Sequence, residues 1–99
     1  MSNPDYPILW TTNAKLDLRD IYLSLEQNIS PLVATKVTDE IFGSLNSIIF
    51  PDQFQIDEYR IDCRRIIIRN YKILYQFHNN TIYVVRIFNT FQDPLKSLK

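Results

Sequence analysis

The chain has 99 residues, 45% of them hydrophobic and 13% aromatic, and its formal net charge is zero. This length and composition exclude a disordered chain and predict one domain, residues 1–99, with one modest core. Cys63 is the only cysteine, which excludes an internal disulfide and a zinc site with paired cysteines. No run approaches the roughly 18 apolar residues of a membrane span, and there is no glycine-rich loop, so we expect a cytoplasmic protein without membrane, metal or cofactor.

The neutral total conceals a split between the two parts of the chain. Residues 1–59 carry nine acids and three bases, a net charge of −6, whereas residues 60–99 carry eight bases and two acids, a net charge of +6. Such an asymmetry can mark a surface for an anionic partner. It can equally mean that the two parts neutralise one another in the fold, and the sequence leaves both interpretations open.

The first predicted elements are a strand and two helices. A short β-forming strand over residues 7–11 leads directly into the N-cap types Thr12 and Asn13. Apolar residues at helical spacing then predict a helix over about residues 13–27. Ser30-Pro31 begins a second helix, which ends before Pro51, because serine caps helices well and proline suits the first helical position. The short connection predicts an antiparallel helical hairpin.

Three antiparallel strands follow, over residues 64–69, 71–77 and 82–88. Their turns fall at Arg69-Asn70 and Asn79-Asn80, since asparagine tolerates the positive φ of tight hairpins. The polar stretch 53–62 holds at most an edge strand, and the tail 94–99 at most a last turn of helix. The expected fold class is α+β, with an N-terminal strand, a helical hairpin and a three-stranded meander packed on the two helices.

If both turns have two residues, the residue numbers of each facing pair add up to 139 in the first hairpin and to 159 in the second. This register sorts the side chains of the three strands between the two faces of the sheet. The core face then receives Ile66, Ile68, Tyr71, Ile73, Tyr75, Phe77, Ile82, Val84 and Phe88. The outer face receives Arg65, Ile67, Arg69, Lys72, Leu74, Gln76, Tyr83, Val85 and Ile87. Arg64 and Arg86 fall on the core face and must reach its rim, unless a one-residue bulge moves them. The mixture of cations and aliphatics predicts an open outer face that binds a partner.

Three stretches, ILWTTNAKLDLRDIY, CRRIIIRNYKILYQF and IYVVRIFNTFQDP, follow one another in the order of the predicted elements and together span most of the chain. By these stretches and this order, the chain resembles, over nearly its whole length, the RelE/ParE superfamily of toxins from bacterial type II toxin–antitoxin pairs. The resemblance implies an α+β domain whose sheet packs on a helical hairpin. It also implies a cognate antitoxin that wraps this domain in a toxin–antitoxin hetero-oligomer.

The superfamily divides by mechanism, and its RelE-like branch cleaves messenger RNA on the ribosome. That reaction needs groups that activate the 2′-hydroxyl, stabilise the phosphate and protonate the leaving oxygen. Lys72 stands where that branch often has arginine, but the position that relatives fill with histidine is Asn89, and Phe91 stands at the nearby basic position. If the chain is a nuclease, its candidate catalytic residues are Arg65, Lys72, Tyr83 or Tyr75, and Gln92.

The ParE-like branch poisons DNA gyrase by binding, and the incomplete acid–base set favours this branch. The leading hypothesis is therefore a non-enzymatic toxin that inhibits DNA gyrase and that an antitoxin neutralises. The alternatives are a ribosome-dependent mRNA endonuclease and an inactive homologue. The candidate binding residues are Arg64, Arg65, Arg69, Lys72, Arg86, Asn89 and Gln92.

Overall fold

The computed structural model describes residues 6–91, and within them the expected order of elements is present. Strand β1 (Ile8–Trp10) precedes helices α1 (Thr12–Asn28) and α2 (Pro31–Ser44) and a 3₁₀ turn, η1 (Leu45–Ser47). Strands β2 (Arg64–Ile68), β3 (Tyr71–His78) and β4 (Thr81–Asn89) complete the fold. The predicted α+β class is confirmed, whereas the predicted turn of helix over 94–99 lies outside the described residues. No helix of residues 6–91 is long and apolar enough to cross a membrane.

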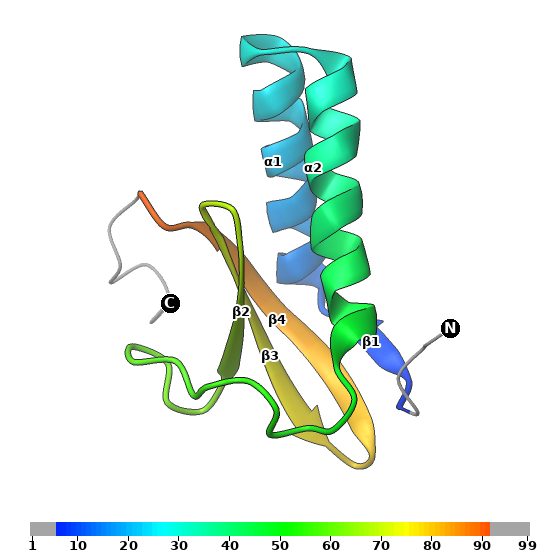
Figure 1. The fold of residues 1–99 in the computed structure, drawn as a ribbon, viewed down its shortest axis with the longest axis vertical. Helices are drawn as coiled ribbons and strands as arrows, with labels where there is room; N and C mark the ends of the chain where they lie inside the picture. Colours follow the sequence, from blue (N-terminus) through cyan, green and yellow to red (C-terminus); the bar gives the residue numbers. More distant parts are fainter. Residues whose placement is uncertain (1–5, 92–99) are drawn as a thin grey trace.

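Both helices begin at a side-chain cap, but the cap of α1 is Thr11, one residue before the predicted Thr12 and Asn13, which lie inside the helix. The cap of α2 is the predicted Ser30. The Ser30 hydroxyl accepts a hydrogen bond from the backbone N–H of Val33 at 3.1 Å, with Pro31 at the first helical position. The turn that separates the helices is only two residues long, which forces them into an antiparallel hairpin. In Figure 1 this hairpin rises well past the end of the sheet. Only the lower part of each helix therefore covers the strands.

The strands form one mixed sheet in the order β1-β4-β3-β2. The β2–β3 register follows the predicted sum of 139, as in the pair Ile66↔Ile73. Asn79 and Asn80 have φ of 51° and 61°, the left-handed pair that a two-residue hairpin turn requires. Strand β1 adds in parallel to β4, with Leu9 opposite Tyr83. The sheet thus joins the two ends of the described chain.

The core lies between the inner sheet face and the helical hairpin. It combines helical residues with alternate residues of the strands: Ala14, Val37, Ile41, Leu45, Ile48, Ile66, Tyr71, Ile73, Tyr75, Ile82, Val84 and Ile87. Tyr75 is fully buried, and its hydroxyl donates to the carbonyl oxygen of Pro51 at 2.8 Å. Burial of the phenol also raises the pKa of Tyr75.

A bulge in β4 corrects the predicted faces of that strand. The register keeps the sum of 159 from His78↔Thr81 to Tyr75↔Val84, but it becomes Leu74↔Arg86 beyond that point. The extra residue is Val85, so Ile87 rather than Phe88 points into the main core. Arg86 therefore lies on the outer face and not on the core face, as expected if a one-residue bulge is present. Phe77 was also expected in the core, but it is 40% exposed, at the end of β3.

The expectation of an open outer face is wrong for its central part. Residues 53–62, here called the covering segment, fold back over it and are held along the free edge of β2. The backbone N–H of Arg65 donates to the carbonyl of Gln55 at 3.0 Å, and that of Asp57 donates to the carbonyl of Cys63 at 2.9 Å. Beneath the segment lies a small second cluster of buried residues: Cys63, Leu74 and Phe88. The edge strand predicted in this stretch is reduced to one bridge, Ile56↔Arg64.

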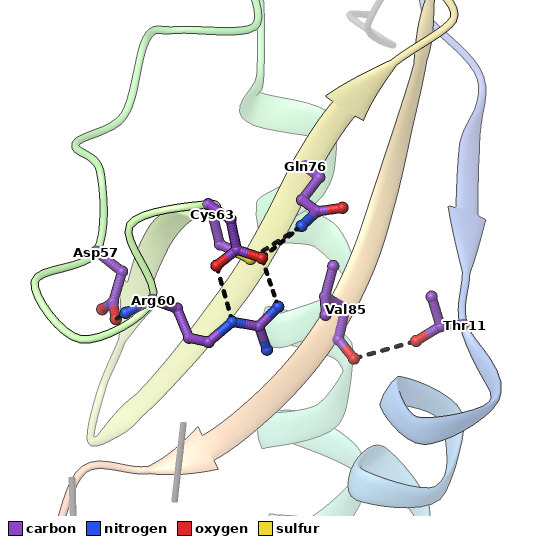
Figure 2. Close-up of polar contacts among 7 residues, drawn as sticks. Thr11, Asp57, Arg60, Cys63, Gln76 and Val85 are labelled. Carbon is purple, nitrogen blue, oxygen red and sulfur yellow. Dashed lines mark hydrogen bonds and ion pairs between the residues drawn. The ribbon is translucent and has the colours of Figure 1, made fainter. Parts of the chain in front are cut away.

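Thr11 joins the first helix to the bulge, and its replacement tests this junction. Its hydroxyl caps α1 by accepting from the N–H of Ala14, at 3.2 Å, and lies 2.9 and 3.1 Å from the carbonyl oxygens of Val84 and Val85 (Figure 2). We expect Thr11→Ala to lower the free energy of unfolding by about 1.5 kcal/mol in urea denaturation, because both interactions are lost. Thr11→Ser should retain most of the stability, and Thr12→Ala, at an exposed site, should change little. Equal losses in Thr11→Ser and Thr11→Ala would contradict the role of the hydroxyl.

Candidate protein-binding site on the outer sheet face

The predicted basic pair, Arg65 on β2 and Lys72 on β3, does share one face of the sheet. Both side chains point to the same carboxylate oxygen of the covering segment. Asp57 Oδ1 lies 2.9 Å from Lys72 Nζ and 3.8 Å from an Arg65 guanidinium nitrogen. Asp57 and Lys72 are only 1% and 9% exposed. The centre of the outer face is therefore a closed charge cluster rather than an open basic surface.

Asp57 is held from two sides. Its Oδ2 accepts backbone hydrogen bonds from Tyr59 at 3.0 Å and from Arg60 at 2.7 Å, which turn the covering segment on itself. Burial by itself would raise the pKa of Asp57, but the short contact from Lys72 and these two N–H groups outweigh it, so the pKa is lowered. Asp57 is consequently ionised at neutral pH. Its negative charge neutralises cations of two neighbouring strands.

A second polar network anchors the end of the covering segment to β3 (Figure 2). The Arg60 guanidinium binds the Asp62 carboxylate through two nitrogens, at 2.9 and 2.7 Å. The Gln76 amide donates to Asp62 at 2.9 Å and lies 3.6 Å from Cys63 Sγ. The Arg60 hydrogen bond is the main reason that the pKa of Asp62 falls to about 2. Burial raises the pKa of the Cys63 thiol, which packs with Leu74 and Phe88 as a small buried hydrophobe.

Apolar side chains surround the closed cluster and remain exposed. Ile56 and Ile61 of the covering segment are 52% and 78% exposed, and Ile67 of β2 is 52% exposed. The Tyr59 ring stands over Lys72, with its centroid 5.2 Å from Nζ. A hollow of about 510 Å³ lies between the segment and the end of β3, lined by Ile61, Phe77 and others. This surface combines aliphatic contact area with buried charge.

The other predicted binding cations are engaged with the rest of the chain. Arg69 reaches Glu40 on α2 at 2.6 Å, so it lies with the helices and not on the outer face. Arg86 binds Asp17 on α1 at 2.8 Å, and Arg64 donates to the carbonyl of Phe54 at 2.8 Å from the rim of the core face. Acids of the first part of the chain thus pair with bases of the second. Of the two interpretations of the charge split, mutual neutralisation is the one that the described residues bear out.

The remaining candidates are spread over the molecule. The Asn89 side chain accepts hydrogen bonds from the Asn70 amide at 3.1 Å and from the backbone N–H of Phe91 at 2.9 Å, so it closes the sheet end. Tyr75 faces the core, on the opposite side of the sheet from Lys72. Tyr83 pairs with Gln76, four residues along β3 from Lys72, a separation of about 13 Å. Gln92 lies outside the described residues.

Sequence reasoning missed the two acids that organise these cations, Asp57 and Asp17. Neither was among the candidate residues that the sequence indicated. Asp57 stands two and three residues before the N–H groups of Tyr59 and Arg60, and aspartate commonly bonds its own following backbone in this way. That local signal predicts a turn. It does not reveal that a strand neighbour will supply the counter-charge.

The fold formed by this mixed sheet and helical hairpin matches that of solved chains from toxin–antitoxin systems. The chain is 20% identical to a chain of the chromosomal ParDE toxin–antitoxin system from P. aeruginosa, with a TM-score of 0.74 over 85% of this chain and 95% of the other. A chain of the RelBE2 toxin–antitoxin complex from Mycobacterium tuberculosis gives 20% identity and a TM-score of 0.57 over 88% and 92%. The isolated E. coli RelE toxin is 15% identical in sequence, with a TM-score of 0.52 over 94% of this chain and 93% of the RelE chain. No curated protein sequence matches the chain.

The sequence itself assigns the family. Residues 8–94 match the family described as ParE toxin of type II toxin–antitoxin system, parDE. The chain therefore belongs to the ParE toxin family, within the RelE/ParE superfamily that the sequence resembles. Within residues 6–91, no group of three or more His, Cys, Asp and Glu side chains could hold a metal ion.

Proposed function

We propose that this chain is a toxin that acts by binding DNA gyrase, and that a cognate antitoxin neutralises it. The observation that carries the proposal is the closed charge cluster, in which Arg65 and Lys72 are both ion-paired with Asp57. A phosphate-cleaving site needs cations free to receive a phosphate and an acid–base group beside them. The cluster offers neither in its present state. Membership of the ParE family supports the same mechanism.

The distribution of the nuclease candidates also favours binding over cleavage. Tyr75 is on the core side of the sheet, and about 13 Å of strand separates Tyr83 from Lys72. Groups that act on one phosphate must lie within hydrogen-bond reach of it or of one bridging water. Neither tyrosine is placed to exchange a proton at a phosphate that Lys72 holds.

Charge balance supports a protein target rather than the ribosome. The net charge of the chain is zero, and Arg69 and Arg86 are paired with acids on the helices. Binding to RNA draws most of its affinity from cations that replace counterions along the phosphate backbone. Here such cations are neutralised internally. A target recognised mainly by apolar contact suits this surface better.

An antitoxin partner follows from the family and from the same surface. Two of the solved relatives are chains of toxin–antitoxin systems, as their descriptions state. An extended or helical antitoxin segment can bury the exposed Ile56, Ile61 and Ile67 as it orders on the toxin. We propose a toxin–antitoxin hetero-oligomer in which this binding removes the toxin from its target.

A gyrase supercoiling assay tests the mechanism. At micromolar concentrations, the purified chain without antitoxin should block supercoiling of relaxed plasmid, and addition of the antitoxin should restore it. Unchanged supercoiling would contradict gyrase as the target.

A second measurement separates the alternatives. Primer extension on mRNA from cells that express the chain should show intact messages, because no cleavage is expected. Cuts at codon positions would instead support the RelE-like endonuclease. Normal growth on induction, together with unchanged supercoiling and intact messages, would identify an inactive homologue.

A further inference from the structure

The covering segment is anchored at its start by Phe54, which packs against the core and whose carbonyl accepts from Arg64 at 2.8 Å. After that point, Asp57 makes the buried contact with the outer face. From residue 55 to residue 62, Asp57 is the only residue that is buried, while Ile56 and Ile61 point into solvent. Apolar burial therefore contributes little to holding this stretch in place. Other links of this stretch are backbone hydrogen bonds along the edge of β2, the Arg65–Gln55 side-chain hydrogen bond at 3.0 Å and the Arg60–Asp62–Gln76 network. Asp57 is the buried charge among these links.

The two oxygens of that carboxylate have different partners. Oδ2 accepts the backbone N–H groups of the segment itself. Oδ1 is buried and has no hydrogen bond of regular geometry, yet it lies 2.9 Å from Lys72 Nζ and 3.8 Å from Arg65. The cations come from adjacent strands, so the β2–β3 register keeps their backbones close together whether or not Asp57 is present. The sheet therefore carries a two-cation cradle, and Asp57 is its occupant.

We propose that Arg65 and Lys72 form a binding site for an acidic side chain of a partner protein, and that Asp57 is an internal plug that this side chain displaces. In the free protein the plug keeps both cations neutralised and the covering segment closed. When the partner carboxylate takes the place of Asp57, one buried ion pair replaces another. Only the difference between the two pairs, and not the full cost of burying a charge, opposes the exchange.

The surroundings of the cradle favour a protein carboxylate over a nucleic-acid phosphate. Beside the cradle, Ile67 pairs with Lys72 across the β2–β3 ladder and Ile56 precedes Asp57, and both isoleucines are 52% exposed. Arg86 and Arg69 are paired with Asp17 and Glu40, so no track of free cations leads along a phosphate backbone from this point. An acidic residue flanked by apolar ones matches both the charge and these apolar neighbours. The inference concerns an intramolecular lock and does not rest on gyrase as the target.

Removal of the plug charge should expose the cradle to small anions. Asp57→Asn keeps an oxygen for the Tyr59 and Arg60 N–H groups but leaves Arg65 and Lys72 without their counter-charge. Sodium phosphate or sodium acetate should raise the Tm of Asp57→Asn by roughly 5 °C when the anion is present at about ten times its dissociation constant. The reference is sodium chloride at equal ionic strength. The wild type should show no such rise, because its cradle is occupied.

Two further variants serve as controls. Asp62→Asn removes a neighbouring, half-exposed acid that is not in the cradle, and it should not respond to the anions. Asp57→Asn combined with Lys72→Met should lose the response, because half of the cradle is gone. Equal anion responses in Asp57→Asn and the wild type would overturn the proposal.

A measurement on the unmodified chain keeps the test independent of how well the variants fold. Cys63 is 2% exposed and directly follows the covering segment, to which its backbone is bonded at Asp57 and Arg60, so lifting the segment should raise the rate of Cys63 alkylation by iodoacetamide. A hexaglutamate peptide should raise this rate several-fold, while hexaglutamine and oligouridylate should not. No effect of hexaglutamate, or a larger effect of oligouridylate, would contradict an acidic protein segment as the ligand.

Discussion

Replacing Lys72 with methionine should lower the free energy of unfolding by about 3 kcal/mol, a fall in Tm of roughly 10–20 °C. Methionine keeps the length and volume of the side chain, so the loss comes from charge and not from a cavity. Asp57, at 1% exposure, would retain only the more distant Arg65 as a counter-charge. Urea and thermal denaturation followed by circular dichroism measure the effect. Lys36→Met, at an exposed position of α2, is the matched control and should change stability by less than about 0.5 kcal/mol.

The same variant should change how stability depends on pH. In the wild type the pKa of Asp57 is lower in the folded than in the unfolded chain. Its carboxylate therefore stabilises the fold above about pH 4, and this contribution is lost as the pH falls through the folded-state pKa. In Lys72→Met, the effect of burial on the Asp57 carboxyl is opposed mainly by the N–H groups of Tyr59 and Arg60, so the pKa of Asp57 should be higher than in the wild type. The fall in the free energy of unfolding between pH 5 and pH 2 should then be smaller. An unchanged pH profile would contradict the Asp57–Lys72 lock.

Asp17→Ala should lower the free energy of unfolding by about 2–3 kcal/mol, because one carboxylate performs two tasks at the edge of the sheet. It binds the Arg86 guanidinium at 2.8 and 3.1 Å, and it accepts the backbone N–H of Ile87 at 2.9 Å. Strand β1 ends its pairing with β4 at Val84, so Asp17 supplies the acceptor that a longer β1 would have provided. Loss of an acceptor at a buried position such as Ile87 costs about 1–3 kcal/mol in such cases.

Two neighbouring substitutions separate the tasks of Asp17. Asp17→Asn removes the charge but can still accept the Ile87 N–H, so it should lose about half as much stability as Asp17→Ala. Asp20→Ala removes the next acid of α1, which is 70% exposed and 3.8 Å from Arg19, and it should be nearly neutral. A loss in Asp20→Ala as large as that in Asp17→Ala would mean that the overall charge of the helix, and not the contact with β4, matters.

Local signals predicted the elements of this fold well. The N-cap Ser30 with Pro31 and the Asn79-Asn80 turn each act within a few residues, so the sequence pattern alone indicates them. The β2–β3 register followed from one assumption, a two-residue turn, because strand pairing propagates from the turn. The family resemblance implied the same helical hairpin packed on the sheet that the short connection between the helices predicts, and the structure has it.

The candidate site was harder to predict because it depends on contacts between distant residues. The bulge at Val85 transfers Arg86 to the outer face and Ile87 to the core, and no residue type in β4 marks that position. The covering segment is irregular, so its path over Lys72 leaves no periodicity in the sequence. Consequently the basic pair was found, but its occupant was not. The binding role of Arg65, Lys72 and the other cations stays a prediction.

The pairing of β1 with β4 bears on how this chain acquires its fold during synthesis. Ile8 aligns with Ile82, so the first strand has no neighbour until the last one has been made. A nascent chain that stops before Thr81 also lacks Arg86 and Ile87, the partners of Asp17. Contacts that span most of a sequence slow folding, since the whole intervening loop must close first. A chain interrupted before Thr81 should therefore lack the β1–β4 pairing, and we expect it not to fold stably.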